Sequence, residues 1–227
     1  MQRTAIPLLL ALVLPVASAH AAQQVHTFVL DLDADGHITR LAPHGAVPGA
    51  VTDALADEIR AWVFHPGPVD QAGAAARTYL RVVVDDAQGE PGGYSVVSAT
   101  TGPALAATTA PDYPMRDQLA GHEGMVVLKL EVAADGRVRA ADVHAATGSV
   151  SRAMATAAVN ASRQWRFATE EVGGAPVAAT LLWPVCYLGA HSTPEACSWT
   201  GPDDQRFSSK TVLPLDPRVT LVSQAAR

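Results

Sequence analysis

The chain has 227 residues, of which 48% are hydrophobic and 5% aromatic, and its 16 basic and 22 acidic residues give a net charge of −6 at pH 7. This acidic balance argues against a nucleic-acid partner and against binding to anionic membranes, because both need a basic surface. The hydrophobic content is enough for a packed aliphatic core and excludes disorder throughout the chain. We therefore expect one large domain or two small ones.

Residues 1–19 have the pattern of a secretory signal peptide. A basic start at Arg3 precedes an apolar run, and residues 17–19 read Ala-Ser-Ala, which fits an A-x-A cleavage site. As a membrane anchor the run is short of the ~20 residues that a spanning helix needs, and it contains Pro7 and Pro15. We expect the segment to be cleaved and the protein exported; a retained segment would instead be a membrane anchor.

The next feature along the chain is an internal repeat. Residues 28–38 read as a strand, an acidic turn ending in Asp35-Gly36 and the start of a second strand, and residues 128–138 repeat this plan around Asp135-Gly136. An Asp-Gly turn between apolar runs is typical of an antiparallel hairpin. The repeat therefore predicts that two hairpins open two similar units.

Each hairpin is followed by an amphipathic helix that ends in a Trp-x-Phe motif and then by another strand. Apolar residues at steps of four, four and three predict one buried stripe on each helix. These residues are Val51, Leu55, Ile59 and Trp62 in the first helix and Val150, Met154, Ala158, Ala161 and Trp165 in the second. Trp62, Phe64, Trp165 and Phe167 are the predicted structural core. The pattern predicts an α+β fold of two tandem β-β-α-β units, each a small antiparallel sheet covered by a helix.

The expected boundaries are a first unit at residues 24–87, a linker at 88–110, a second unit at 111–188 and an irregular tail at 189–227. The linker is rich in Gly, Thr, Ala and Pro, although residues 94–98 offer a further strand. Cys186 and Cys197 allow one pairing in an exported chain, so we predict a structural disulfide that holds the tail.

The second unit resembles the C-terminal domain of TonB, the periplasmic energy transducer. The resemblance is carried by the ordered motifs P-x-Y-P at residues 111–114, E-G-x-V at 123–126, D-G-x-V at 135–138 and W-x-F at 165–167. It covers about residues 111–187, and the first unit looks like a degenerate copy without the P-x-Y-P motif. The family implies a periplasmic domain that adds a strand from an outer-membrane receptor, the TonB box, in transport across the envelope.

The resemblance also implies partner-binding residues, namely Tyr113, Pro114 and Arg116 before the sheet and Val177, Ala179, Leu181 and Trp183 along the last strand. An edge strand offers unpaired N–H and C=O groups to an extended peptide. Pro184 fits an edge position, because proline removes a ladder donor; alternatively, it ends the strand before the disulfide loop. The signal peptide and the lack of a long Pro-rich spacer leave two functions open, contact with TonB-dependent receptors or a soluble adaptor module with no energy-transducing role.

The sequence contains no motif for catalysis or cofactor binding. A G-x-S-x-G elbow, a phosphate-binding loop and paired metal-ligand histidines are all missing from the chain, so we expect no enzyme, no cofactor and no metal. The turn at Asp31, Asp33 and Asp35 copies the start of a calcium-binding loop, but its twelfth position is Ala42. A hairpin turn is the favoured interpretation of this segment. The expected partner is an outer-membrane receptor or another envelope protein, with membrane contact only if the N-terminal segment is retained.

Overall fold

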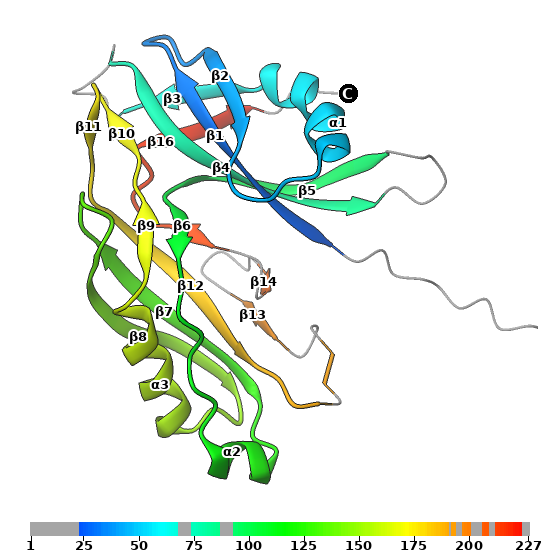
Figure 1. Cartoon of the computed structure of the whole chain (residues 1–227), viewed down its shortest axis with the longest axis vertical. Helices are drawn as coiled ribbons and strands as arrows, with labels where there is room; N and C mark the ends of the chain where they lie inside the picture. The colour runs from blue at the N-terminus through cyan, green and yellow to red at the C-terminus, as the bar shows by residue number, and fades with distance from the viewer. Residues whose placement is uncertain are drawn as a thin grey trace, which may run out of the picture.

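The computed structural model describes residues 23–67, 74–86, 93–190, 192–193, 197–200, 206–208 and 212–223; the predicted signal peptide lies outside them. The described chain forms two lobes, one built mainly from its first hundred residues and the other from residues 109–188 (Figure 1). Antiparallel strands dominate and the helices are few, which confirms the predicted α+β class. Among the described residues no helix is both long and apolar enough to span a bilayer.

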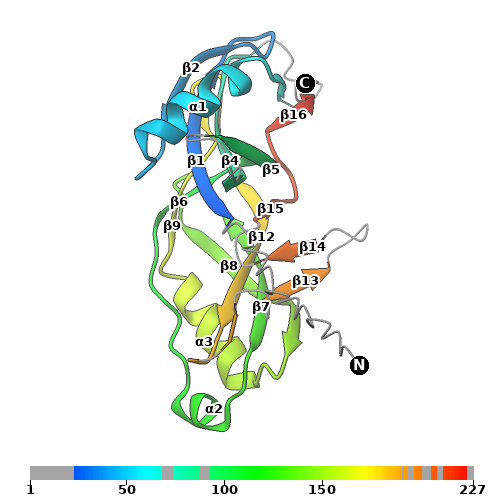
Figure 2. The same ribbon diagram turned by 90° about the vertical axis from the view of Figure 1, so that its right-hand side faces the viewer.

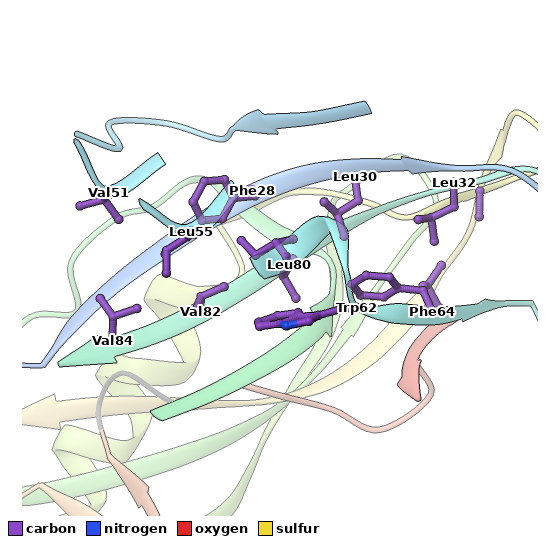
Figure 3. Packing of buried hydrophobic residues seen from close by; sticks show 13 residues of the cluster. Phe28, Leu30, Leu32, Val51, Leu55, Trp62, Phe64, Leu80, Val82 and Val84 are labelled. Atoms are coloured by element: carbon purple, nitrogen blue, oxygen red, sulfur yellow. The ribbon is translucent and has the colours of Figure 1, made fainter. Parts of the chain in front are cut away.

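The first lobe is a sheet covered on one face by a helix. It contains β1 (Gln24–Leu32), β2 (Ile38–Pro43), α1 (Gly49–Arg60), β3 (Val63–Pro66), β4 (Ala76–Asp86) and β5 (Tyr94–Gly102). Leu55 and Ile59 of α1 pack with alternate residues of β1 and β4, since side chains on one face of a strand recur every second residue (Figure 3). Trp62 and Phe64 are only 3% and 1% exposed in this core.

The second lobe repeats the order of hairpin, helix, short strand and long strand, with an additional helix at its start and the β10–β11 hairpin before the long strand. It contains α2 (Met115–Ala120), β7 (Gly124–Val132), β8 (Val138–Gly148), α3 (Arg152–Ser162), β9 (Arg166–Ala168) and β12 (Ala179–Tyr187). Met154 and Ala158 of α3 pack on the inner face of β7 and β12, and Trp165 and Phe167 are buried in this core as their counterparts are in the first.

The two Asp-Gly turns make the same contact in their lobes. Gly36 and Gly136 have φ values of +87° and +80°. A Cβ atom at either position would lie 2.0 Å from a carbonyl oxygen, that of Phe64 in the first lobe and that of Phe167 in the second. Each turn therefore needs glycine for two reasons, the left-handed backbone and the close approach of the strand that follows the helix.

The predicted linker contains ordered strands. β5 pairs with β4, and β6 (Ala104–Ala107) pairs with β9 of the second lobe. A short hairpin of the second half, β10 (Glu171–Val172) and β11 (Ala175–Pro176), joins the first sheet by pairing with β4. The sheet order is thus β11-β10-β4-β1-β2, with β5 also on β4, and the lobes are interlocked. The sequence offered a strand at residues 94–98, and β5 contains it. The linker-like composition gave no sign of β6 or of the pairing of β10 with β4.

The tail also departs from the prediction of irregular structure. It contains β13 (Ser198–Thr200), β14 (Arg206–Ser208), β15 (Leu213–Pro214) and β16 (Val219–Ser223). β13 and β14 form a hairpin beside the second lobe, and β16 returns to pair with β3, where Val219 is completely buried in the first core (Figure 2). Strands of two to five residues carry too little periodicity to be recognised, and the pairing partners of β15 and β16 lie far away in the sequence.

Candidate protein-interaction edge

The last long strand of the second lobe, β12, is paired fully on one side and only briefly on the other. β7 pairs with it from Ala179 to Tyr187. On the outer side β15 pairs only at Leu181 and Leu182. Beyond these, Thr180 donates its N–H to Asp216 Oδ1 at 2.6 Å and accepts from the N–H of Leu215 at 2.8 Å.

The direction of the backbone groups follows from these contacts. Thr180 points its N–H and C=O away from β7, so Leu182, Pro184 and Cys186 do the same, because the ladder alternates with a period of two. Within the described part of the chain no strand pairs with this outer side from Trp183 to Tyr187. Pro184, Val185 and Tyr187 are buried and the other two residues are half-buried, so the stretch is a candidate edge for an added strand because of its unpaired backbone and not because of exposed side chains.

The structure decides between the two interpretations of Pro184. β12 continues past it to Tyr187, and Pro184 stays in register opposite Val127 of β7. Pro184 therefore does not end the strand. Its nitrogen lies on the outer side, where the missing N–H costs no bond to β7, as expected for proline beside an edge.

The side chains predicted to bind a partner along β12 face the protein core instead. Ala179 and Leu181 are buried. Trp183 packs edge-on against Trp165 and Phe167, with both ring centroids 5.6 Å away. Val177 lies just before the strand, half-buried, and donates its N–H to Glu170 O at 2.9 Å. A peptide added here would meet backbone groups of β12, and these side chains would act by holding the strand in place.

The other predicted partner residues lie at α2. Pro114 is at the helix N-terminus, Tyr113 is half-buried, and Arg116 is exposed. The Tyr113 ring packs edge-on against Tyr187 at 5.2 Å, and its hydroxyl donates to His122 O. Burial raises the pKa of the Tyr113 phenol. The P-x-Y-P motif thus fixes this helix against the end of β12.

Two exposed apolar residues of α2 were missed by the sequence reasoning. Met115 and Leu119 are 73% and 82% exposed. They are four residues apart, so they share one face of the helix, and this spacing is the signal that the sequence offered. α2 is held by Asp117, whose carboxylate is 2.8 Å from His122 Nδ1; this hydrogen bond lowers the pKa of Asp117.

The disulfide prediction is confirmed. Cys186 of β12 is bonded to Cys197, which is fully buried. Cys197 packs with Met125, Val127 and Leu182 on the sheet face opposite α3. The bond therefore carries the chain after β12 across this face rather than back along the strand edge.

The turn that copies the start of a calcium loop lies in the hairpin between β1 and β2. Asp33, Asp35 and His37 bring potential ligand atoms within 4.8 Å of one another and are the residues best placed to hold a cation. Asp33 Oδ1 already accepts from the N–H groups of His37 and Asp35, at 2.9 and 3.0 Å, and the His37 bond in particular lowers its pKa. Ala42, at the twelfth loop position, lies in β2 opposite Val29.

Comparison with known proteins gives the family of the second lobe. Residues 109–188 match the model of the Gram-negative bacterial TonB protein C-terminal. The solution NMR structure of the Pseudomonas aeruginosa TonB CTD is 24% identical and aligns over 40% of this chain and 90% of that chain, with a TM-score of 0.34. No curated protein is significantly similar.

Residues 109–188 are therefore a domain of the TonB C-terminal family, as the ordered motifs of the sequence predicted. Domains of this family are non-enzymatic interaction domains of Gram-negative envelope proteins. They interact with envelope and outer-membrane proteins.

Proposed function

We propose that this protein is an exported periplasmic module that binds outer-membrane TonB-dependent receptors by adding a receptor strand to the outer side of β12. The observation that carries this function is the stretch from Trp183 to Tyr187, which no strand of the described chain pairs on that side. Strand addition supplies affinity through main-chain hydrogen bonds. It therefore fits an edge whose side chains face the core.

The exposed face of α2 supplies side-chain contacts next to this edge. Tyr113 links the α2 region to Tyr187, the last residue of β12. A peptide extending past that residue would reach the apolar side chains of Met115 and Leu119 and the charge of Arg116. These residues would distinguish one receptor segment from another, because the backbone of β12 is the same for every peptide.

The segment of β15 limits the available edge. It covers Leu181 and Leu182, and Asp216 holds the N–H of Thr180. A short receptor strand would pair beyond Leu182, whereas a longer strand would have to displace β15. Two paired residues, the backbone bond from Leu215 to Thr180 and one side-chain bond make β15 weakly held compared with β7, which pairs along the whole of β12.

A titration of the mature chain with a synthetic TonB-box peptide, followed by NMR amide shifts and amide exchange, tests this function. We expect saturable binding, with shifts of the backbone amides around Cys186 and slowed exchange at Cys186, whose N–H faces outward beyond the part of β12 that β15 covers. A peptide of the same composition with a central proline is the control and should not protect this amide. The proposal would be overturned if the shifts were confined to β8, the other edge of this sheet. It would also be overturned if binding did not saturate at about 1 mM peptide.

Leu119→Ser tests the contribution of α2. The variant should weaken peptide binding by about two- to fivefold, because it removes one exposed apolar contact. Val97→Ser is the matched control, since Val97 is also an exposed apolar residue, at 49%, but lies in the first lobe. Equal effects of the two substitutions would exclude α2 from the binding surface.

The adaptor module without energy transduction is the second candidate function. It is favoured if residues 1–19 are removed, because a protein without a membrane segment has no direct connection to an inner-membrane motor. The mass and N-terminal sequence of the native protein decide this point. A chain starting at His20 in the periplasmic fraction supports the adaptor, and a full-length chain in the membrane fraction supports direct transduction.

A further inference from the structure

A cavity of about 510 Å³ lies between the first sheet and the second lobe. Its walls come from the face of β1, β4 and β5 that is turned away from α1, from the segment around β6, from Trp183 of β12 and from the tail around Val212 and Pro214. The volume is in the range of sites that hold small molecules, which are frequent at the junctions between domains. The cavity differs from the receptor edge proposed above, which is the backbone of β12 beyond Leu182, but it adjoins that edge because Trp183 of β12 and Pro214 of β15 line it.

One wall of the cavity is polar, and Arg81 is at its centre. In the sheet Arg81 of β4 lies directly opposite Thr27 of β1 on one side and Thr100 of β5 on the other. Side chains of directly opposite residues share one face with Cβ atoms about 5 Å apart. The register therefore places the arginine between two threonines in one row of the cavity wall. A guanidinium and two hydroxyl groups are donors that suit an oxyanion.

Tyr79 and His44 extend the polar wall beside this row. Their rings pack edge-on with centroids 4.8 Å apart, and both residues line the cavity. Gly102 lies opposite Tyr79 in the register, and a Cβ there would be 2.5 Å from Pro214 Cγ. A larger residue at Gly102 would push Pro214 away, so this glycine lets the tail close the cavity wall.

The opposite wall is apolar. Leu105, Trp183, Val212 and Pro214 line it, and the first three also belong to the hydrophobic core of the second lobe or pack against it. Among the described residues that line the cavity, Arg81 is the one Lys or Arg side chain, and no Asp or Glu is present. The lining thus combines a single permanent positive charge with an extensive apolar surface.

Burial makes the Arg81 charge costly. Desolvation lowers the pKa of Arg81 to about 10, so the side chain is still protonated at neutral pH but poorly hydrated. An anion bound beside it would offset this loss of hydration. A guanidinium has five N–H donors, so Arg81 can bind a carboxylate in addition to its contacts within the chain.

We propose that this cavity binds a small amphipathic organic acid, with its carboxylate at Arg81, Thr27 and Thr100 and its apolar body against Trp183, Leu105 and Val212. A single charge in the wall favours a monoanion over a phosphate dianion, which usually requires more than one cation. The site would join the two lobes, since the acid group contacts the first and the apolar body contacts the second.

Isothermal titration of the mature chain with 4-phenylbutyrate, and with its neutral amide as the matched ligand, tests the site. We expect the acid to bind about tenfold more tightly than the amide. Arg81→Met keeps most of the apolar stem and should remove this preference. Arg60→Met, at an exposed arginine of α1, is the control variant and should leave both affinities unchanged.

A second pair of variants keeps the test decisive if Arg81→Met does not fold. Thr27→Val and Thr100→Val each replace a hydroxyl by a methyl group of similar size. Each should lower the affinity for the acid by about three- to fivefold and leave the affinity for the amide unchanged. Equal binding of acid and amide by the unaltered chain would overturn the proposal. Absence of saturable binding of phenylbutyrate, octanoate and decanoate at about 5 mM would also overturn it.

Discussion

The long strands β4 and β12 each follow the helix and the short strand of their lobe but end in different surroundings. β4 is paired along both sides, by β1 on one side and by β5 and β10 on the other. β12 is paired fully by β7, but on its outer side only at Leu181 and Leu182. Similar elements have therefore produced one strand, β4, that is paired on both sides and one strand, β12, whose outer side no described strand pairs beyond Leu182. A strand-adding partner fits the second.

The chain that follows each strand explains the difference. After β4 it returns as β5 and pairs directly with the strand that it has just left. After β12 the disulfide between Cys186 and Cys197 directs the chain over the face of the sheet, where Cys197 is buried with Met125 and Val127. In the part of the chain that the structure describes, β15 is the strand that pairs with the outer side of β12.

The largest expected effect tests whether the two lobes share their turn contact. Gly36→Ala and Gly136→Ala should each lower the free energy of unfolding by about 3 kcal/mol or more, because the new Cβ meets a backbone carbonyl that cannot move aside. Gly45→Ala is the control, since Gly45 also has a positive φ, +78°, but open space around it. The Gly45→Ala substitution should lower the free energy of unfolding by about 1 kcal/mol. Urea unfolding measures all three, and equal losses would contradict the shared contact.

A smaller effect concerns the carboxylate that seals the first sheet. Glu170 is 1% exposed and accepts from Thr78 Oγ1 at 2.7 Å and from the N–H groups of Arg218 and Val219 at 2.9 and 3.3 Å. It therefore ties the hairpin of β10 and the tail to β4. Glu170→Gln keeps one acceptor oxygen but turns an amide toward these donors, and it should cost about 1 to 2 kcal/mol at low pH.

The pH dependence of this cost has a defined sign. Burial raises the pKa of Glu170 above its usual value of 4.5. The folded state then holds its proton more tightly than the unfolded state, so Glu170 contributes most below about pH 4.5 and its contribution falls as the pH rises through the folded pKa. The stability difference between the native protein and Glu170→Gln should shrink from low to high pH in urea unfolding. A difference that grows with pH would contradict this assignment.

The smallest effect concerns the short cover on β12. Asp216→Ala removes the acceptor of the Thr180 N–H and should cost about 1 kcal/mol, seen as roughly fivefold faster exchange of that amide. If β15 competes with a receptor strand, the same variant should bind the TonB-box peptide a few-fold more tightly. Asp57→Ala is the control, because Asp57 is almost fully exposed in a surface pair with Arg60. Unchanged Thr180 exchange would show that Asp216 does not hold β15.

Local patterns predicted much of the fold. The alternation in residues 28–32 and 128–132, the Asp-Gly turns and the apolar stripes of α1 and α3 predicted both hairpins, both helices and the burial of Trp62 and Trp165. These features depend on contacts within about forty residues, where periodicity and turn chemistry act directly. The candidate edge came instead from the resemblance to TonB and from the position of Pro184. The inward direction of Leu181 and Trp183 was not expected.

The sequence by itself determined the class of each unit, the ordered motifs of the TonB C-terminal family and the single possible disulfide. The tertiary structure alone decided that β10, β11 and β16 complete the first lobe, that β15 covers part of β12, and that Arg81, Thr27 and Thr100 line one cavity with Trp183. These pairings join segments roughly 20 to 160 residues apart. Strands of two to five residues leave no periodic signal, and only the closed packing of both lobes selects their partners.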